Sequence, residues 1–303
     1  MITVERLTRR FGTVAAVDGI TFEVRAGEVF GLLGPDGAGK TTLFRMLAAV
    51  LEPSAGTARV AGADVRAAPE QVKSRIGYMP QAFALYGDLT VLENLRFVAE
   101  VYGVPRAEIA PRLDRLLGFS RLDRFTGRLA DQLSGGMRQK LALAATLLHD
   151  PDVLLLDEPT TGVDPVSRRE FWQILYELNQ SGKTVVVATP YMDEAERCGR
   201  VALMHQGRIL SVDRPADLRD RFPGTILEVV ASPRRAALAA VRALPQVSQA
   251  TVFGHTLHVV VGDEEAGEGI AGALRGAGIR VEQVRPITPS LEDVFVSLMG
   301  RPA

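Results

Sequence analysis

A glycine-rich segment near the N-terminus carries residue types suited to phosphate chemistry. The run from Gly34 to Thr41 reads GPDGAGKT and matches the pattern GxxxxGK[ST]. Glycines in such a loop let successive backbone N–H groups close around phosphate oxygens, and the helix that follows adds the positive end of its dipole. Lys40 would neutralise the outer phosphates and the Thr41 hydroxyl would ligate Mg²⁺. The segment therefore predicts a site for a nucleoside triphosphate.

Two adjacent carboxylates are the second candidate feature. Asp157 and Glu158 follow the continuous apolar run from Val153 to Leu156, which is typical of a buried parallel strand. Alternation along a strand would point the two side chains in opposite directions, so Asp157 could support Mg²⁺ while Glu158 faces the phosphate and its water. Two acids at the end of a buried strand are costly without a nearby cation, which favours a functional role.

Two further segments are open to more than one interpretation. Gln81 ends the apolar run from Ile76 to Pro80 and could reach Mg²⁺ or orient an attacking water, although a lone glutamine at a strand end often has no function. Ser134, Gly135 and Gly136 precede a long apolar helix and could form a second anion-binding surface. A plain N-cap explains Ser134 alone equally well.

An aromatic ring precedes the phosphate loop. Phe11 stands next to Gly12 and could offer a ring on which adenine stacks. A surface aromatic or a plug of the core explains Phe11 equally well from its neighbours alone.

The elements that must position these residues follow from apolar periodicity. Strands are expected at 2–7, 20–24 and 29–33, with residues 9–13 joining the first two, and a helix is expected at 42–48. Helical periodicity dominates residues 90–148, which predicts a helical insertion (about 85–148) between two halves of an α/β core. Further on, the pattern predicts a helix at 166–178 and strands at 184–188, 201–204 and 209–212.

The end of the chain predicts a second, smaller domain. A boundary is expected at residues 221–224, with the first domain at 1–220 and the second at 223–303. The order strand, helix, strand, strand, helix, strand suggests an α+β ferredoxin-like module, with one more helix capped by residues 289–293. No catalytic cluster is visible in this part of the sequence.

Composition limits the classes of function. The 303 residues are enough for about two domains, and the net charge of −1 offers no basic footprint for nucleic acid. The single cysteine, Cys198, fits a reducing cytosol. No apolar run reaches the roughly 18 residues that a membrane span needs, so any membrane crossing is expected to belong to another protein.

Five motifs occur in one order, at residues 34–41 (GPDGAGKT), 78–81 (YMPQ), 133–140 (LSGGMRQK), 154–159 (LLLDEP) and 161–164 (TGVD). With them, residues 1–220 resemble the ATP-binding subunits of ATP-binding-cassette (ABC) transporters. The stretch 78–94 is similar to ATPases of ABC-2-type exporters, especially the first cassette of the YbhF-like exporters, and also to DrrA-like ATPases. The resemblance implies a P-loop NTPase cassette, with a RecA-like core, a β-subdomain and a helical insertion.

The resemblance also implies roles. Phe11 would stack on adenine, and Glu158 would be the general base, assisted by Gln81 and Lys40. Thr41, Gln81 and Asp157 would support Mg²⁺. The residues expected to hold ATP within this chain are Gly34, Gly37, Ala38, Gly39, Lys40, Thr41 and Thr42. The residues expected to close on the ATP of a partner cassette are Ser134, Gly135 and Gly136. Asp164, in the TGVD motif, is also expected to bind the nucleotide.

The implied protein is an ATPase on the cytoplasmic face of the membrane that drives a separate ABC-2-type permease for drug, lipid or ion efflux. Its implied partners are that permease and a second cassette, identical or not, and no nucleic acid. Phe83, Leu85 and Tyr86 would border the groove for the permease, although core packing explains them nearly as well.

One departure from the family pattern puts turnover in doubt. Pro190 stands where the family has a histidine, and proline offers neither a side-chain donor nor a backbone N–H. The hypothesis that follows is a site of reduced rate. The alternatives are a regulatory half of an asymmetric ATPase pair and an ABC ATPase without a transport function.

Overall fold

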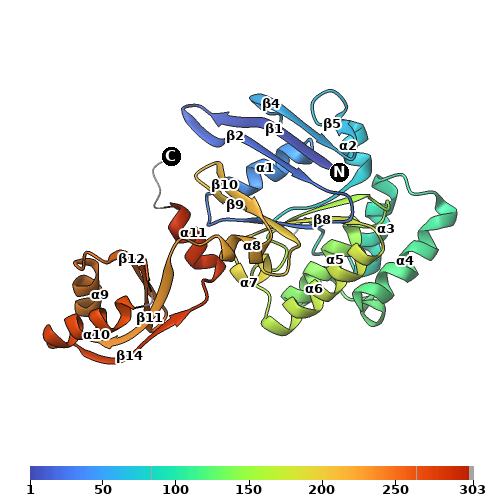
Figure 1. The fold of residues 1–303 in the computed structure, drawn as a ribbon. Coiled ribbons are helices and arrows are strands. Elements are labelled where there is room, and N and C mark those ends of the chain that lie inside the picture. Colours follow the sequence, from blue (N-terminus) through green and yellow to red (C-terminus); the bar gives the residue numbers. More distant parts are fainter. Residues whose placement is uncertain (83, 264, 300–303) are drawn as a thin grey trace. The chain divides into compact units, whose positions relative to one another are not determined.

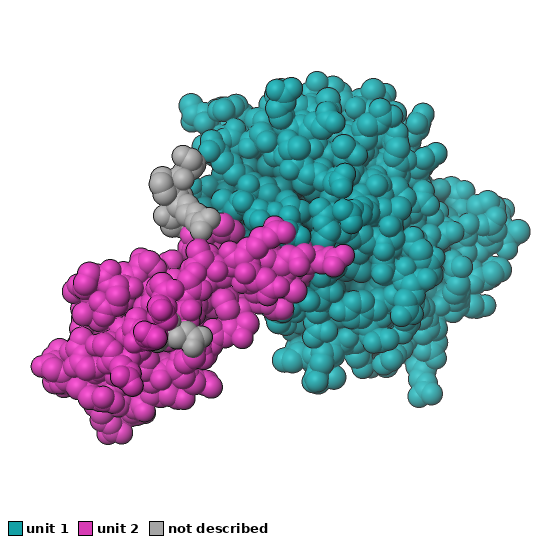
Figure 2. All heavy atoms as spheres, viewed as in Figure 1, with its two compact units in different colours: residues 1–213 teal, residues 214–303 magenta. Residues whose placement is uncertain are grey.

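The computed structural model describes residues 1–82, 84–263 and 265–299. Within the chain, contacts define two compact units, residues 1–213 and 214–303 (Figure 2). The helix α8 (Pro215–Asp220), which the sequence placed in the first domain, belongs to the second unit. None of the described helices combines the length and the apolar character that crossing a lipid bilayer requires.

The first unit opens with an antiparallel sheet of four strands in the order β2-β1-β4-β5 (Figure 1). These strands are β1 (Ile2–Phe11), β2 (Val14–Val24), β4 (Ala55–Val60) and β5 (Ala63–Asp64). The prediction that residues 9–13 form the connection was wrong, because Arg9, Arg10 and Phe11 pair with β2. The antiparallel ladder continues past the buried part of β1, where apolar periodicity gives no signal.

A second sheet of six strands, in the order β10-β9-β3-β8-β7-β6, forms the centre of this unit. Its strands are β3 (Val29–Leu33), β6 (Ile76–Met79), β7 (Val153–Asp157), β8 (Thr184–Thr189), β9 (Arg200–His205) and β10 (Arg208–Asp213). All neighbours pair in parallel except β9 and β10. The carboxyl ends of β3, β6, β7 and β8 therefore lie along one edge.

Helices join these strands: α1 (Lys40–Leu47), α2 (Pro69–Arg75), α6 (Pro165–Gln180) and α7 (Met192–Ala195) in the core, and α3 (Val91–Val101), α4 (Arg106–Ser120) and α5 (Gly135–Thr146) in the insertion. Figure 1 shows α3, α4 and α5 grouped beside the sheet, with α6 next to α5. One apolar core joins the two sheets and α1, and the stacked rings of Phe22 and Phe30 lie 5.6 Å apart within it.

The second unit has an antiparallel sheet in the order β12-β13-β11-β14. After α8 come β11 (Thr225–Ser232), α9 (Arg234–Arg242), β12 (Val247–Phe253), β13 (Thr256–Val261), α10 (Ala266–Gly276), β14 (Arg280–Ile287) and α11 (Leu291–Met299). The order of elements is the predicted βαββαβ pattern followed by one helix. The strand order is that of a ferredoxin-like fold, so this prediction is confirmed.

Candidate nucleotide site

The phosphate loop connects β3 to α1 and depends on glycine at its closest approaches. Gly39 is the N-cap of α1 and has φ of +105°, and a Cβ there would lie 2.3 Å from the Ala16 carbonyl oxygen. A Cβ at Gly34 would lie 2.4 Å from the Met204 carbonyl oxygen. Other residues would clash with backbone at both positions, so the loop can hold its curve only with glycine.

A cavity of about 270 Å³ opens over this loop. It is bordered by residues from four segments: Ala16, Asp36, Gly37, Ala38, Gly39, Lys40, Thr41, Thr42, Gln81 and Glu158. The structure thus brings most of the candidate phosphate-binding residues to one place, at the carboxyl edge of the central sheet and the N-terminus of α1. Such an edge is where ligands bind in open α/β sheets, and a helix N-terminus there favours an anion.

Lys40, Gln81 and Glu158 form a connected cluster at this cavity. The Lys40 ammonium donates to the carbonyl oxygens of Gly34 at 2.8 Å and Pro35 at 3.1 Å, and it lies 3.1 Å from Glu158 Oε1. Gln81 Nε2 donates to Glu158 Oε2 at 2.9 Å, although 77 positions separate the two residues. Lys40 is only 3% exposed and Glu158 6%, so the ion pair is largely shielded from solvent.

A left-handed backbone turn separates Glu158 from its neighbour Asp157. Asp157 is the last residue of β7, whereas Glu158 has φ of +51° and its backbone N–H donates to the Ala188 carbonyl oxygen at 2.9 Å. Positive φ is uncommon for a residue other than glycine and marks a constrained position. The two carboxylates consequently occupy different surroundings.

Asp157 is completely buried, and neither of its carboxylate oxygens has a hydrogen-bond partner within the described residues. Burial raises the pKa of this carboxyl above its usual range, and the charge of Glu158 adds to the effect. The Thr41 hydroxyl, which lies nearby without meeting hydrogen-bond geometry, and the Lys40 ammonium oppose the shift. A buried carboxylate with both oxygens unsatisfied, next to a threonine hydroxyl, fits the oxygen ligands that Mg²⁺ requires.

Thr161 is a member of this cluster that sequence reasoning missed. Its hydroxyl donates to Glu158 Oε2 at 3.3 Å, from the turn that follows β7. A threonine in a polar loop carries no distinctive sequence signal, and only the position three residues after Glu158 could have suggested it.

Ser134, Gly135, Gly136 and Asp164 do not border the cavity, and they lie together elsewhere. Ser134 caps α5 and accepts from the Met137 backbone N–H at 3.3 Å, so the N-cap interpretation is confirmed as geometry. Gly135 approaches Gly162, since a Cβ on Gly135 would lie 3.5 Å from the Gly162 carbonyl oxygen. Together these residues form an exposed edge, with Gly136 buried behind it.

Asp164 is the N-cap of α6 and lies on the same exposed edge. Its carboxylate accepts from the backbone N–H groups of Val166 and Ser167, both at 3.0 Å. Hydrogen bonds from the Ser167 side chain and backbone hold the pKa of Asp164 below its usual range. The side chain therefore stays ionised and fixes the start of α6.

Phe11 is not among the residues that border the cavity. Its ring is 49% exposed, so the interpretation as a core plug was wrong. The Arg9 guanidinium lies 4.7 Å from the ring centroid and covers one face. A planar ligand would have the other face of the ring available to it.

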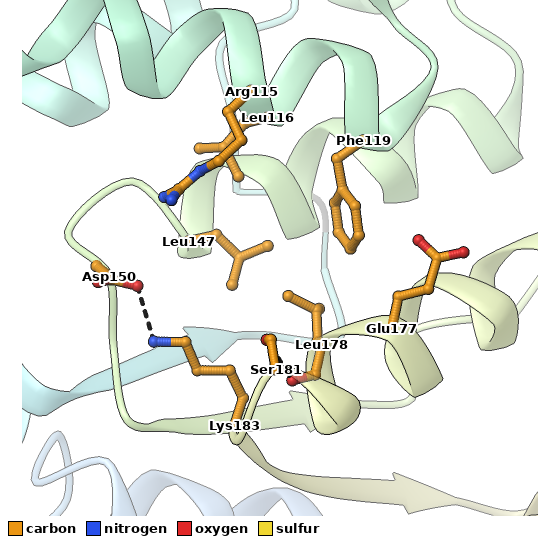
Figure 3. Close-up of a pocket in the computed structure, with 9 residues that line it drawn as sticks. All are labelled: Arg115, Leu116, Phe119, Leu147, Asp150, Glu177, Leu178, Ser181 and Lys183. Carbon is orange, nitrogen blue, oxygen red and sulfur yellow. Dashed lines mark hydrogen bonds and ion pairs between the residues drawn. The ribbon is translucent and has the colours of Figure 1, made fainter.

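A larger pocket, of about 380 Å³, lies between α4, α6 and the ends of two connections (Figure 3). The floor of the pocket is apolar. Asp150 and Lys183, which also border it, form an ion pair with 2.7 Å between Nζ and Oδ1. These two residues precede β7 and β8, so the pocket is at the amino ends of the strands. It has no glycine loop or helix N-terminus for phosphate, and the smaller cavity is the better candidate.

Two family models match the chain. The model "ABC transporter" matches residues 17–161, and the model "ATP-binding protein DrrA1-3-like, C-terminal domain" matches residues 214–299. The second match begins at the boundary between the two compact units.

Curated relatives match over nearly the whole chain. "Probable multidrug ABC transporter ATP-binding protein YbhF" of Escherichia coli is 43% identical over 305 residues, covering 99% of this chain and 52% of the relative. The chain thus spans about half the length of that relative. "Nod factor export ATP-binding protein I" of Ralstonia nicotianae is 38% identical over 312 residues, covering 99% of this chain and 94% of the relative.

Solved structures agree with these relatives. CbiO1 of Clostridium perfringens, "part of the ABC transporter complex cbiONQ", has a TM-score of 0.67 at 29% identity, covering 73% of this chain and 90% of that one. The "ATP-binding cassette MJ0796 bound to ADP and Pi" has a TM-score of 0.65 at 26% identity, covering 71% and 98%. The predicted cassette fold is confirmed, and the chain belongs to the family of ABC transporter ATP-binding proteins.

Proposed function

We propose that this protein binds ATP at the cavity over residues 34–42 and hydrolyses it with Glu158 as general base. The observation that carries the proposal is the cluster at the carboxyl edge of the sheet. There, Lys40 and Gln81 hold Glu158 beside the buried Asp157, whose carboxylate has no hydrogen-bond partner among the residues that the structure describes. A cation and an anionic ligand together would satisfy the groups that the protein itself leaves unpaired.

In the proposed reaction, a water attacks the γ-phosphorus and the bond from that phosphorus to the β–γ bridging oxygen breaks. Glu158 takes the proton of the attacking water, and ADP and inorganic phosphate leave. Lys40 and the backbone N–H groups of the phosphate loop bind the phosphates. Mg²⁺ held by Thr41, Asp157 and Gln81 would neutralise charge on the phosphate oxygens. Gln81 and Thr161 orient the Glu158 carboxylate through their hydrogen bonds.

We propose further that a second cassette completes each site. One chain carries one phosphate loop and one Ser134 edge, and the Ser134 edge does not border its own cavity. The N-terminus of α5, exposed at Ser134 and Gly135 with Gly136 buried behind them, offers N–H groups to an anion from outside the chain. Asp164 lies on the same edge and would contact the partner's nucleotide. The second cassette would be another copy of this chain or a related one.

A separate membrane permease is the proposed partner for transport. An apolar groove of about 140 Å³ lies between β6 and the helical insertion, and residues bordering it include Tyr78, Leu85 and Tyr102. Beside it, Tyr86 is 52% exposed and its ring meets that of Phe97 edge to face. We propose that an ABC-2-type permease docks here, at the inner face of the membrane. Phe83, which was predicted for the same groove, lies outside the described residues.

The name of one relative describes a multidrug ABC transporter, and the name of another describes Nod factor export. We propose efflux of a drug, lipid or ion as the transport function of this chain. Affinity isolation of the tagged chain from membranes of the producing cell tests this proposal. Recovery of a permease together with a cassette supports it, and recovery of ribosomal or DNA-repair proteins instead would favour an ABC ATPase without a transport function.

A regulatory half-site of reduced turnover is the second candidate, and Pro190 is the observation that favours it. Pro190 follows Thr189, whose carbonyl oxygen accepts from the Gly34 backbone N–H at 3.3 Å, so the residue stands next to the phosphate loop. It has no donor for a phosphate oxygen. Steady-state ATPase rates of the wild type, Pro190→His and Glu158→Gln test both candidates. A slow wild type that Pro190→His accelerates supports the second, and equal rates in all three would refute hydrolysis at this site.

A further inference from the structure

Glu194 is a buried acid close to the proposed site that has no part in the reaction described above. Its side chain is fully buried in α7. One carboxylate oxygen accepts a short hydrogen bond from the Thr160 hydroxyl, and the other accepts from the Thr189 hydroxyl at 2.7 Å. Arg168 Nε lies 3.6 Å from the first oxygen. A buried carboxylate is stable only when it is paired and hydrogen-bonded, so Glu194 requires its contacts with Thr160, Thr189 and Arg168.

The two threonines belong to the two segments that flank the general base. Thr160 lies in the turn after β7, and the next residue, Thr161, donates its hydroxyl to Glu158 at 3.3 Å. Thr189 ends β8, immediately before Pro190, and its carbonyl oxygen accepts from the Gly34 backbone N–H. Glu194 therefore links the turn that carries Glu158 to the strand end that contacts the phosphate loop.

A third segment reaches the same carboxylate. Arg168 comes from the first turn of α6, the helix that Asp164 caps on the exposed edge. Its guanidinium also lies 4.4 Å from the centroid of the Tyr191 ring and 3.9 Å from Asp193. A displacement of the edge near Asp164 is thus connected, through packed and hydrogen-bonded side chains, to the residues on both sides of Glu158.

We propose that Glu194 is a positioning residue for hydrolysis. It holds the turn at Thr160 and the strand end at Thr189 in one arrangement, and this arrangement fixes the Glu158 carboxylate. The contact between Glu194 and Thr189 is the more important because Pro190, the next residue, has no side-chain donor or acceptor with which to anchor its own loop. The inference rests on the proposed hydrolysis of ATP at this site.

Substitutions that remove single hydroxyls without changing shape test the inference. In Thr160→Val and Thr189→Val, one donor to Glu194 is lost while volume is kept, and Thr189→Val also removes the acceptor of the Tyr191 backbone N–H. We expect kcat to fall about tenfold, which corresponds to the loss of one hydrogen bond to a charged group, with the Kd for ATP within about twofold. Thr160→Ser and Thr189→Ser keep the hydroxyl and are expected to retain kcat within about twofold of the wild type. Glu194→Gln should behave like the valine variants.

Thr184→Val is the matched control. Thr184 is as buried as Thr189 and begins the same strand, and its hydroxyl accepts from the Gly27 backbone N–H at 3.0 Å, far along β8 from Glu158. We expect this variant to lose thermal stability like Thr189→Val and to keep the wild-type kcat. If Thr189→Val and Thr160→Val lose stability but keep kcat in the folded protein, the positioning role is refuted.

The outcomes for the inference and for the proposed function are distinct. A wild type without ATP turnover refutes the proposed hydrolysis, and the inference falls with it. A wild type with turnover that the valine and glutamine variants match refutes the inference alone. A combined Thr160→Val and Glu194→Gln variant supports the inference if its loss in kcat is no greater than that of either single change, because both remove one link.

Discussion

Each compact unit contains an acid that is largely shielded from solvent and paired with a basic side chain, and the two pairs differ in which neighbouring polar atoms lack a hydrogen-bond partner. In the second unit, His258 Nδ1 lies 2.7 Å from Asp293, and the other oxygen of Asp293 accepts from the Ser290 backbone N–H at 2.9 Å and hydroxyl at 2.6 Å. The ring of Phe253 stacks on His258 at 4.2 Å. In the first unit, Glu158 is similarly paired with Lys40, but the adjacent Asp157 has no hydrogen-bond partner within the described residues.

The difference separates a structural network from a site. Ser290 and Asp293 form a reciprocal cap at the start of α11, since the Asp293 backbone N–H also donates to the Ser290 hydroxyl. With His258, they attach this helix to β13. Asp157 ends β7 next to Glu158, which borders the cavity over the glycine-rich loop, and an external cation would complete the environment of Asp157. Buried charge that the protein leaves incomplete is the better indicator of a binding function.

The largest expected contrast between the two pairs is in catalysis. Glu158→Gln should lower kcat for ATP hydrolysis about 10³-fold, because the amide cannot take the proton of the attacking water. Asp293→Asn should leave kcat unchanged within about twofold, since it alters only the helix attachment. Steady-state phosphate release measures both. Equal losses in the two variants would show that the comparison does not separate site from structure.

The second contrast is in stability. Asp293→Ala removes the partner of His258 and the cap of α11, and we expect it to lower the free energy of unfolding of the second unit by about 2 kcal/mol. Denaturant titration of the whole protein, followed by probes in each unit, measures the loss. When His258→Ala is made in the Asp293→Ala protein, it should lower the free energy of unfolding by less than it does in the wild type, because the two residues interact. Fully additive losses would contradict a shared network.

Substitution of Asp157 is expected to change the free energy of unfolding in the opposite direction from substitution of Asp293. Asp157→Asn removes a buried charge that has no hydrogen-bond partner in the described part of the chain, so it should raise the free energy of unfolding of the nucleotide-free protein by about 1 kcal/mol. The same change should abolish the additional stabilisation that Mg²⁺ gives in the presence of ATP. Thermal unfolding with and without Mg²⁺ measures both effects. A destabilised variant that still responds to Mg²⁺ would exclude Asp157 as a ligand.

The smallest contrast concerns histidine. His149 stacks on Tyr102 at 4.0 Å, and its Nε2 donates to the Ile76 carbonyl oxygen at 2.8 Å. Among the described residues, no carboxylate forms an ion pair with His149 as Asp293 does with His258. Burial lowers the pKa of His149 below its usual value of 6.5, and the hydrogen bond to Ile76 opposes this shift. The unfolded chain therefore binds a proton at a higher pH than the native protein does, and stability falls as pH drops from about 6.5 through the lowered pKa.

His149→Phe keeps the stacked ring and removes the titrating group. We expect it to lose less stability than the wild type does between pH 7 and pH 5. Urea unfolding at a series of pH values measures the difference. His255→Gln, at a solvent-exposed position of the β12–β13 turn, is the control. An identical pH profile for the wild type and His149→Phe would refute the assignment.

Local sequence patterns were sufficient to predict the strand and the loop that position the site. The apolar run before Asp157 and the glycine spacing up to Lys40 each depend on a few consecutive residues, and the structure places both as expected. The ferredoxin-like order of the second unit followed from the same kind of signal. These features are encoded locally, so periodicity and turn chemistry can detect them.

The contacts that complete the site depend on folding over long separations. The hydrogen bond from Gln81 to Glu158 and the contacts of Glu194 with Thr160 and Thr189 join segments that only the sheet topology brings together. A polar residue in a loop does not reveal which distant group it will meet. The start of the second unit before α8 was missed for the same reason, because it depends on contacts between α8 and α11.

Single-turnover hydrolysis tests the central claim most directly, with protein in excess over radiolabelled ATP and with binding measured in the same samples. The wild type and Glu158→Gln should bind ATP with Kd values within about threefold, since the carboxylate is not a phosphate ligand. The wild type should convert its bound ATP to ADP and phosphate, and Glu158→Gln should retain intact ATP. Conversion at the same rate by both proteins, or by neither, would contradict the assignment of Glu158 and its cavity as the site of hydrolysis.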